Sequence, residues 1–374
     1  MRKIVKIITH WLSYIIPTSS DIFVFHSFPF YTDNTYAIYK YIKKNLNVRC
    51  VWLYDPEDLE MAPQGEEWPS VKYKRLSIKG IWYYYRAKYV FCSHGLNGFI
   101  ELHQKDKIVN MWHGMPLKCI GCMDAKFGGT NPTKADYLVA TSPAFQEVMA
   151  KSFNNMLKER VLLIGQPRND LMYEPTDFYD KIGHSRSDYR KVGIWLPTYK
   201  QSAIGDIRSD GVFYEDGISF LNIDQLSTLN ERLKEKKDLL VVKLHPMDIL
   251  QQKEMPKFSN LLILKQKEFS SQLYPFLGSC DYLLTDYSSV WVDYEILNRP
   301  IGFVMNDVEQ YKTSRGFTFD NLVDLLPGPI VDNLDALIAF CNTPDKYYCS
   351  RTDMFNIYRD NHASERLLKA LKII

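Results

Sequence analysis

Short hydrophobic segments alternate with longer segments of helical spacing along most of this chain. Aliphatic and aromatic residues dominate the short segments, which predicts buried β-strands. In the first half of the sequence these segments are DIFVF (21–25), VRCVWLY (48–54), KYVFCS (88–93), KIVNMW (107–112), DYLVATS (136–142) and RVLLIG (160–165). Strands that alternate with helices in this way are typical of parallel sheets built from βαβ units.

The intervening segments have the spacing of amphipathic helices. They include residues 33–45 and 142–159, and the second of these begins with Ser142 in the capping position and Pro143 at the first helical position. A polar stretch, residues 173–191, then interrupts the alternation and is interpreted as a linker or crossover.

The alternation resumes in the second half of the chain. Strands are expected at 191–199, 239–246, 261–265, 281–286 and 299–305, and helices at 224–236, 289–297 and 363–371. We therefore expect an α/β protein with two Rossmann-like doubly wound domains facing a central cleft. The expected division is an N-terminal helix (1–18), a first domain (19–175), a second domain (176–355) and a C-terminal helix (356–374) able to cross back to the first domain.

The N-terminal segment MRKIVKIITHWLSYIIP has apolar residues at helical spacing and basic residues crowded at its start. This combination is typical of a helix that lies at a membrane interface. A signal peptide and an amphipathic helix packed on its own domain are the alternatives. The aromatic and basic segment KGIWYYYRAKY (79–89) favours membrane contact, and no segment reaches the roughly 18 apolar residues that a spanning helix needs.

Composition narrows the class of protein. The 374 residues include 46 Lys plus Arg against 44 Asp plus Glu, so no global field attracts nucleic acid. Seven cysteines are scattered, and Cys119 and Cys122 form a lone C-x-x-C pair, which disfavours both a disulfide framework and a structural zinc site. We expect a peripheral protein on the cytoplasmic face of the membrane. Glycine-rich dinucleotide and ATP motifs are missing from the sequence.

Polar residues with chemical potential follow several of the expected strands. His113 follows KIVNMW, Thr198 follows GIWLP, His245 follows VVKL, and Asp286 follows YLLT. Because parallel α/β sheets bind ligands beyond the carboxyl ends of their strands, the coincidence favours one functional site. Each residue taken alone also fits an ordinary position in a turn, a core or a helix cap.

The second half of the chain suits phosphate binding. Ser288 and Ser289 begin an expected helix, whose N-terminal N–H groups and hydroxyls can hold a phosphate. Lys243 lies two residues before His245, so strand alternation puts both side chains on one side. A hydrogen-donating imidazole at His245 would stabilise charge on a transferred phosphate.

His113 suits the opposite role, that of a base. An imidazole with an ordinary pKa of about 6.5 can accept a proton from an attacking hydroxyl at neutral pH. Gly114 would let a substrate approach the backbone closely. Arg168 and Asp170, in GQPRND, add a phosphate-binding cation and an orienting carboxylate, although an ion pair at a domain hinge is an equal alternative.

Several of these motifs occur together in a consistent order over residues 21 to 370. They are MWHGMPLKCIG, GQPRND, LPTYK, KLHP, TDYSSVWVDYEILNRPIGF and DNHASER. In this set the sequence resembles the CDP-glycerol glycerophosphotransferase family of teichoic acid primases and polymerases, most specifically in HGMPLK and TDYSS. In FHSFPFYTDNTYAIYKYI, Pro29, Phe30 and Tyr31 stand where members commonly carry a glycine.

The resemblance implies a GT-B type fold with the nucleotide mainly in the second domain and the acceptor mainly on the first. It implies that His113 is the base and His245 a second essential histidine. The expected donor-phosphate contacts are Thr198, Lys243, Asp286, Ser288, Ser289 and Arg168, with Gly114 and Asp170 in support. No metal cofactor and no nucleic-acid partner are expected.

The implied reaction transfers glycerol phosphate from CDP-glycerol to a hydroxyl of a lipid-linked saccharide or growing poly(glycerol phosphate), releasing CMP. It belongs to the synthesis of teichoic acid or of a capsule-type polymer. The chain is little more than a catalytic core, which favours a primase or a capsule-type transferase. Alternatives are a CDP-ribitol donor, a GT-B glycosyltransferase that uses a nucleotide sugar, and a membrane scaffold without activity.

Overall fold

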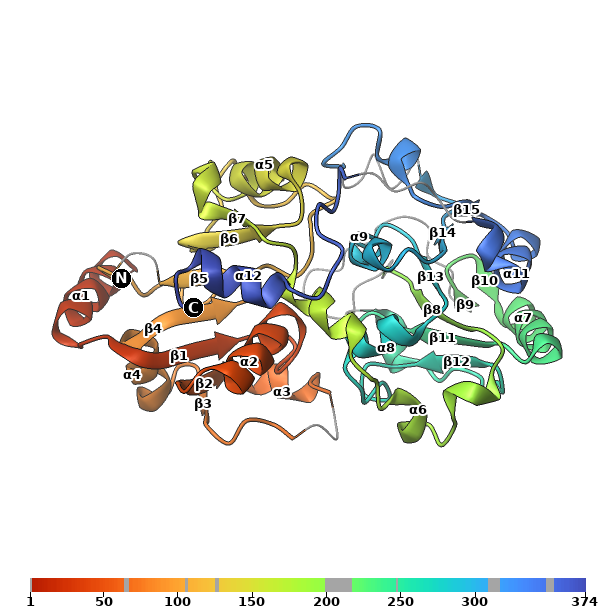
Figure 1. The fold of residues 1–374 in the computed structure, drawn as a ribbon, viewed down its shortest axis with the longest axis horizontal. Helices are drawn as coiled ribbons and strands as arrows, with labels where there is room; N and C mark the ends of the chain where they lie inside the picture. Colours follow the sequence, from red (N-terminus) through yellow and green to blue (C-terminus); the bar gives the residue numbers. More distant parts are fainter. Residues whose placement is uncertain are drawn as a thin grey trace. The chain divides into compact units, whose positions relative to one another are not determined.

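The computed structural model describes residues 2–63, 67–104, 107–124, 128–198, 217–246, 248–308, 317–347 and 353–374. The chain forms two compact units, each with one parallel sheet (Figure 1). The first unit comprises Met1–Met115, Ile120–Leu171 and Asp360–Ile374, and the second comprises Pro116–Cys119 and Met172–Arg359. The units divide after residue 171 where the sequence suggested 175, and the second unit also takes residues 116–119.

The sheet of the first unit has seven parallel strands in the order β3-β2-β1-β4-β5-β6-β7. The strands are β1 (Ser19–His26), β2 (Arg49–Tyr54), β3 (Lys72–Lys74), β4 (Ala87–Cys92), β5 (Ile108–Asn110), β6 (Tyr137–Ala140) and β7 (Val161–Leu163). Pairings such as Val24 with Val51 and Val24 with Val90 set the register of the central strands. These valines are fully buried, so the hydrophobic pattern also fixes which side chains form the core.

This unit also contains helices. They are α1 (Arg2–Ile15), α2 (Asp33–Asn45), α3 (Pro56–Glu60), α4 (Ile78–Arg86), α5 (Pro143–Ser152) and α12 (Ala363–Ala370), with 3-10 turns η1 (Gly121–Met123), η3 (Lys158–Arg160) and η4 (Pro167–Tyr173). The C-terminal helix α12 packs beside α2 on the first unit (Figure 1). Its neighbour α2 spans the expected residues 33–45.

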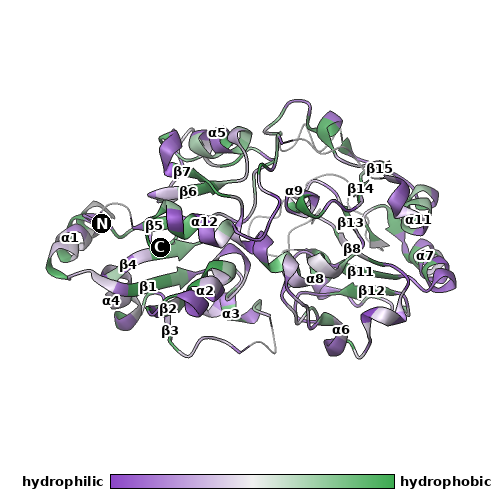
Figure 2. Ribbon diagram, viewed as in Figure 1, coloured by the Kyte–Doolittle hydropathy of each residue, from purple (hydrophilic) through white to green (hydrophobic). Residues whose placement is uncertain are grey.

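The sheet of the second unit has six parallel strands in the order β12-β11-β8-β13-β14-β15. Its strands are β8 (Val192–Leu196), β11 (Leu239–Lys243), β12 (Leu261–Leu264), β13 (Tyr282–Thr285), β14 (Ile301–Val304) and β15 (Ile330–Val331), and a separate hairpin is formed by β9 (Gly217–Ile218) and β10 (Leu221–Asn222). Several strands of both sheets carry the hydrophobic colour in Figure 2, as expected for strands buried on both faces.

The helices of the second unit complete its layers. They are α6 (Phe178–Lys181), α7 (Ile223–Lys236), α8 (Leu273–Ser279), α9 (Val290–Tyr294) and α11 (Leu334–Asn342), with 3-10 turns η5 (Arg186–Asp188), η6 (Ile249–Gln252), η7 (Glu295–Leu297), η8 (Leu322–Leu325) and η9 (Pro344–Tyr347). Helices α7 and α11 pack together, and their leucines meet the buried strand residues in one core.

Three expectations need correction. The helix predicted for 142–159 ends at Ser152, although Ser142 caps it as expected by accepting from the Phe145 N–H. The polar stretch 173–191 lies between β7 and β8, as expected of a crossover, but it also belongs to the core of the second unit, because Phe178 and Tyr179 are buried and their rings pack against Phe276. The helix predicted for 289–297 forms only a five-residue α-helix, α9, followed by the 3-10 turn η7.

Candidate active site

Both sheets have the strand order in which the chain starts at the centre, builds outward in one direction, and then returns to build the other half. The reversal falls between β1 and β4 in the first unit and between β8 and β13 in the second. Ligands of doubly wound sheets bind beyond the carboxyl ends of the strands at this switch point. The candidate ligand-binding residues are therefore those that follow β4, β5, β8, β11 and β13.

In the first unit, His113 lies in the turn after β5. Trp112 has a φ of 57° and Gly114 a φ of 133°, so the backbone turns sharply on both sides of the histidine. Gly114 thus serves a backbone conformation that other residues rarely adopt. The Trp112 N–H donates to the Asn110 side-chain oxygen at 2.9 Å, which holds the start of the turn.

The hydrogen bonding of His113 determines the tautomer of its neutral ring. Its Nδ1 lies 3.2 Å from the carbonyl oxygen of Ser93, at the end of β4. A carbonyl can only accept, so Nδ1 carries the proton of the neutral ring and Nε2 holds a free lone pair. Desolvation lowers the pKa of His113 below 6.5, while the Ser93 carbonyl and Asp33 oppose this and Arg168 reinforces it. The residue itself remains exposed to solvent.

Asn34, in the first turn of α2, fastens this turn to the rest of the unit. Its buried side-chain amide donates to the carbonyl oxygens of Trp112, at 3.0 Å, and of Met111, at 3.5 Å, and to the Gln166 side chain. Its Oδ1 accepts from the Arg168 N–H at 3.0 Å. One side chain therefore joins α2, the turn after β5 and η4.

The structure separates Arg168 from Asp170. The Arg168 guanidinium donates to both carboxylate oxygens of Asp33, at 2.9 and 3.1 Å, and both side chains are largely buried. Asp170 instead accepts from the N–H groups of Ala363 and Ser364, at 2.9 and 2.8 Å, at the start of α12. Asp170 thus stabilises a helix N-terminus, and the carboxylate beside Arg168 is that of Asp33.

Sequence reasoning missed two further histidines of the first unit. His94 follows β4 and stacks on His113 with ring centroids 4.3 Å apart and planes 7° from parallel. His26 ends β1, is buried, and hydrogen-bonds the Leu53 carbonyl oxygen at 3.2 Å, and burial lowers its pKa to about 4. The available signal for His94 was its position directly after KYVFCS, since His113 was found from the same strand-end position.

In the second unit, Thr198 and Asp286 meet at the switch point. Thr198 follows β8 and Asp286 follows β13, and these strands are paired neighbours. The backbone N–H of Thr198 donates to Asp286 at 2.8 Å, and its hydroxyl donates to the other carboxylate oxygen. Both residues are buried, so the pair links the segments that follow the two strands. Tyr199 and Lys200 of the same motif lie outside the described residues.

Lys243 is the last residue of the neighbouring strand β11, and His245 follows that strand. His245 is half-buried and lies in a turn. Its carbonyl oxygen accepts from the backbone N–H of Asp248 at 2.9 Å and from the side-chain amide of Gln251 at 3.0 Å. The Lys243 ammonium donates to the Gln266 side chain at 2.7 Å and lies 5.5 Å from the centre of the Phe269 ring. Burial lowers the pKa of Lys243 to about 8.

Ser288 and Ser289 precede α9 and are half-buried. Ser289 occupies the N-cap position, and its side chain makes no capping hydrogen bond. Nearby, Asp248 was missed from the sequence. Burial raises its pKa to about 6, and the charge of Asp286 adds to the shift.

The lone pair Cys119 and Cys122 is divided between the two units. Cys119 belongs to the second unit and Cys122 to the first, and neither forms a disulfide. Over the described ranges, no group of three or more His, Cys, Asp or Glu side chains is arranged to hold a metal ion. Within the same ranges, no helix is long and apolar enough to cross a bilayer.

With this geometry in hand, comparison with known proteins identifies the class. Residues 8–372 match the family described as CDP-Glycerol:Poly(glycerophosphate) glycerophosphotransferase, and the chain belongs to this family. It is 24% identical to a teichoic acid poly(glycerol phosphate) polymerase of Bacillus spizizenii, over 89% of this chain and 86% of that protein. It is 26% identical to a teichoic acid glycerol-phosphate transferase of Staphylococcus aureus, over 91% and 90% of the two chains.

The fold agrees with that of a solved relative. The wall teichoic acid polymerase TagF superposes with a TM-score of 0.74 at 23% sequence identity, covering 100% of this chain and 92% of that chain. At this identity the match establishes the fold.

Replacing Asn34 by leucine tests the support of the His113 turn. The leucine has a similar size, but it leaves the Trp112 carbonyl and the Arg168 N–H without their buried partner. We expect the free energy of unfolding to fall by about 2–4 kcal/mol, measured by denaturant titration of the full chain. Asn45→Leu, at an exposed position of the same helix, is the control and should change it by less than about 0.5 kcal/mol. Equal stability of the two variants would contradict the assignment.

Proposed function

We propose that this glycerophosphotransferase moves glycerol phosphate from CDP-glycerol to a hydroxyl of a lipid-linked saccharide or a growing poly(glycerol phosphate) chain. The observation that carries the proposal is the His113 ring, which donates from Nδ1 to the Ser93 carbonyl and keeps the Nε2 lone pair for a substrate proton. Its lowered pKa keeps the ring neutral at pH 7, as a base requires.

The proposed step is a displacement at phosphorus. The acceptor oxygen attacks the β-phosphorus of CDP-glycerol while its proton passes to Nε2 of His113. The bond from the β-phosphorus to the bridging oxygen breaks, and CMP leaves with the bonding electron pair. The base adds reactivity to the hydroxyl and typically contributes about 10²- to 10⁴-fold.

We assign the donor to the carboxyl end of the second sheet. Thr198 and Asp286 join the carboxyl ends of β8 and β13 at the switch point, and Ser288 and Ser289, which follow Asp286, offer hydroxyls. His245, after the adjacent strand β11, would donate to the phosphate or to the leaving CMP. Lys243 adds positive charge from the same strand. Arg168, paired with Asp33 in the first unit, is assigned to the support of the His113 turn.

We also propose that α1 binds the membrane surface. The helix docks on its own unit through polar side chains: Thr9 accepts from the Glu101 N–H at 3.0 Å, and Ser13 accepts from the His103 N–H at 2.9 Å. The Tyr14 ring stacks on His103 at 4.0 Å. The opposite face leaves large apolar residues exposed, and these are Ile4, Ile7, Ile8, Trp11, Leu12 and Ile15.

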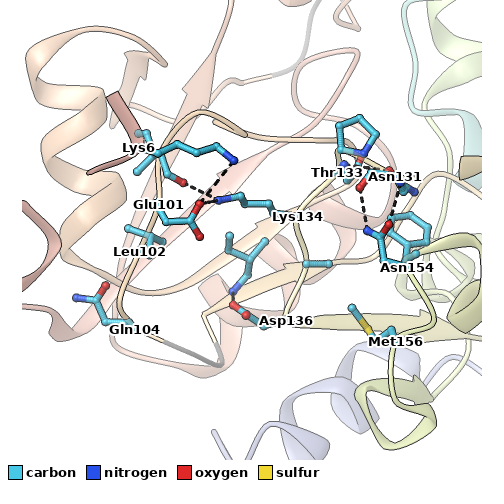
Figure 3. A pocket seen from close by; sticks show the side chains of 15 residues that line it. Lys6, Glu101, Leu102, Gln104, Asn131, Thr133, Lys134, Asp136, Asn154 and Met156 are labelled. Atoms are coloured by element: carbon cyan, nitrogen blue, oxygen red, sulfur yellow. Dashed lines mark hydrogen bonds and ion pairs between the residues drawn. The ribbon is translucent and has the colours of Figure 1, made fainter. Parts of the chain in front are cut away.

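This orientation is the reverse of a helix that packs on a soluble core, where the apolar face points inward. A helix with polar residues inward and apolar residues outward suits a bilayer surface. Figure 3 shows how a nearby cavity of about 530 Å³ is lined where α1 meets the unit. There Glu101 pairs with Lys134 at 2.5 Å and approaches Lys6 of α1 at 3.9 Å, which adds a charged contact to the docking.

The triple variant Ile8→Ser, Trp11→Ser, Ile15→Ser tests the membrane role. These side chains are 54%, 65% and 74% exposed, so their removal should leave the fold intact. Co-sedimentation with anionic liposomes should weaken by at least about tenfold, because each side chain loses apolar burial in the bilayer. The control is Leu157→Ser, which changes an exposed leucine elsewhere in the first unit and should bind liposomes as the unchanged protein does. Unchanged binding of the triple variant would remove the membrane assignment.

Product analysis with His113→Ala tests the reaction. The unchanged protein is incubated with a lipid-linked acceptor and either CDP-glycerol, CDP-ribitol or a nucleotide sugar, and products are identified by mass. We expect CMP release and addition of glycerol phosphate with CDP-glycerol. His113→Ala should lose at least about 100-fold in turnover while keeping its thermal unfolding transition.

Two results would count against this function. Transfer of a sugar from a nucleotide sugar would indicate a glycosyltransferase, whose reaction takes place at an anomeric carbon. Full activity of a folded His113→Ala variant would show that another group removes the proton. Transfer from CDP-ribitol would keep the chemistry and change the donor.

A further inference from the structure

The ring that lies flat against His113 belongs to His94, which the family resemblance did not single out. β4 and β5 are paired parallel strands with Cys92 opposite Asn110, so the residues that follow them emerge side by side. The two imidazoles stack at 4.3 Å with planes only 7° apart. Trp112 contacts the His113 ring as well, at 4.2 Å and 32°, so His113 is confined by two aromatic surfaces.

Ser93 connects the two rings. Its carbonyl oxygen accepts from Nδ1 of His113 at 3.2 Å, and its hydroxyl hydrogen-bonds Nδ1 of His94 at 2.9 Å. Ser93 is fully buried, and its N–H donates to the His26 carbonyl at the end of β1. Phe28 closes the far side of His94 by an edge contact at 5.7 Å. The orientation of His94 is thus determined from several elements at once.

The charges around the pair come from three other elements. Asp33 at the start of α2 and Arg168 in η4 act on His113, and His26 at the end of β1 acts on His94. Desolvation, with a contribution from the charge of His113, lowers the pKa of His94 well below 6.5. Burial therefore favours the neutral form of the His94 ring.

We propose that His94 is a positioning residue for the His113 base. Its ring fixes the plane of the His113 imidazole so that Nε2 points at one place. It also keeps water from one face of that imidazole. When His113 takes up the acceptor proton, the imidazolium lies face-on over a neutral aromatic ring, an arrangement that stabilises a cation. The inference rests on the proposed function of His113, and it adds a residue whose side chain need not touch the substrate.

Replacing His94 by alanine removes the ring, whereas replacing it by phenylalanine keeps a flat ring without the imidazole nitrogens. With the full-length protein, CDP-glycerol and a lipid-linked acceptor, His94→Ala should lower kcat about 3- to 10-fold with an unchanged KM for CDP-glycerol. Water then reaches a further face of the His113 ring, so the pKa of His113 rises toward 6.5, and the acidic limb of the kcat/KM profile moves to higher pH. His94→Phe keeps a flat ring at the same place and should restore both kcat and the limb.

Controls distinguish this inference from the function beneath it. His184→Ala removes an exposed histidine of the second unit and should leave kcat and the acidic limb unchanged. His113→Ala reports on the base itself. An active His113→Ala variant refutes the base, whereas an inactive one with a fully active His94→Ala variant refutes only the positioning role.

Two outcomes overturn the proposal. One is a folded His94→Ala variant with the kcat and acidic limb of the unchanged protein. The other is a folded His94→Phe variant as impaired as the alanine variant, since a flat ring would then be insufficient. Thermal unfolding of each variant, followed by circular dichroism, establishes that the comparison concerns folded protein.

Discussion

The hydrogen bond from Nδ1 of His113 to the Ser93 carbonyl oxygen is the interaction on which the proposed chemistry depends. It joins the ends of two neighbouring strands and leaves Nε2 as the basic nitrogen. The turn that carries His113 is held in a rare backbone conformation at Trp112 and is fastened by the buried amide of Asn34. Without these contacts, the orientation of the His113 imidazole would not be fixed.

The two units share one type of sheet topology. Each builds a parallel sheet outward from its first strand and then reverses, and ligands of such sheets bind beyond the carboxyl ends of the two central strands. The first unit places Ser93 and His94 there, and the second places Thr198 and Asp286. Hydrophobic burial determines which segments form the strands. The residues just after the strands lie in loops, where polar side chains can serve a function.

Much of the fold could be predicted because buried parallel strands and amphipathic helices leave strong local patterns. The strand 261–265 and the helix 33–45 are examples, whereas β3, β9, β10 and β15 have two or three residues and leave no periodicity to detect. The site was only partly predictable. Strand ends pointed to His113, Thr198 and Asp286, but the contacts of Asn34 with Trp112 and Gln166 join residues far apart in the chain. The sequence also gave no indication of the partners of Asp170 at α12 or of Lys243 at Gln266, which lie far from them in the chain.

The tautomer of His113 tests the account most directly. In protein with ¹⁵N-labelled histidine, long-range ¹H–¹⁵N correlations at neutral pH distinguish a protonated from an unprotonated ring nitrogen, and a His113→Ala sample assigns the signal. The account predicts a neutral ring with its proton on Nδ1 and none on Nε2. A proton on Nε2, or on both nitrogens, would contradict it, because the ring would then have no lone pair with which to accept the acceptor's proton.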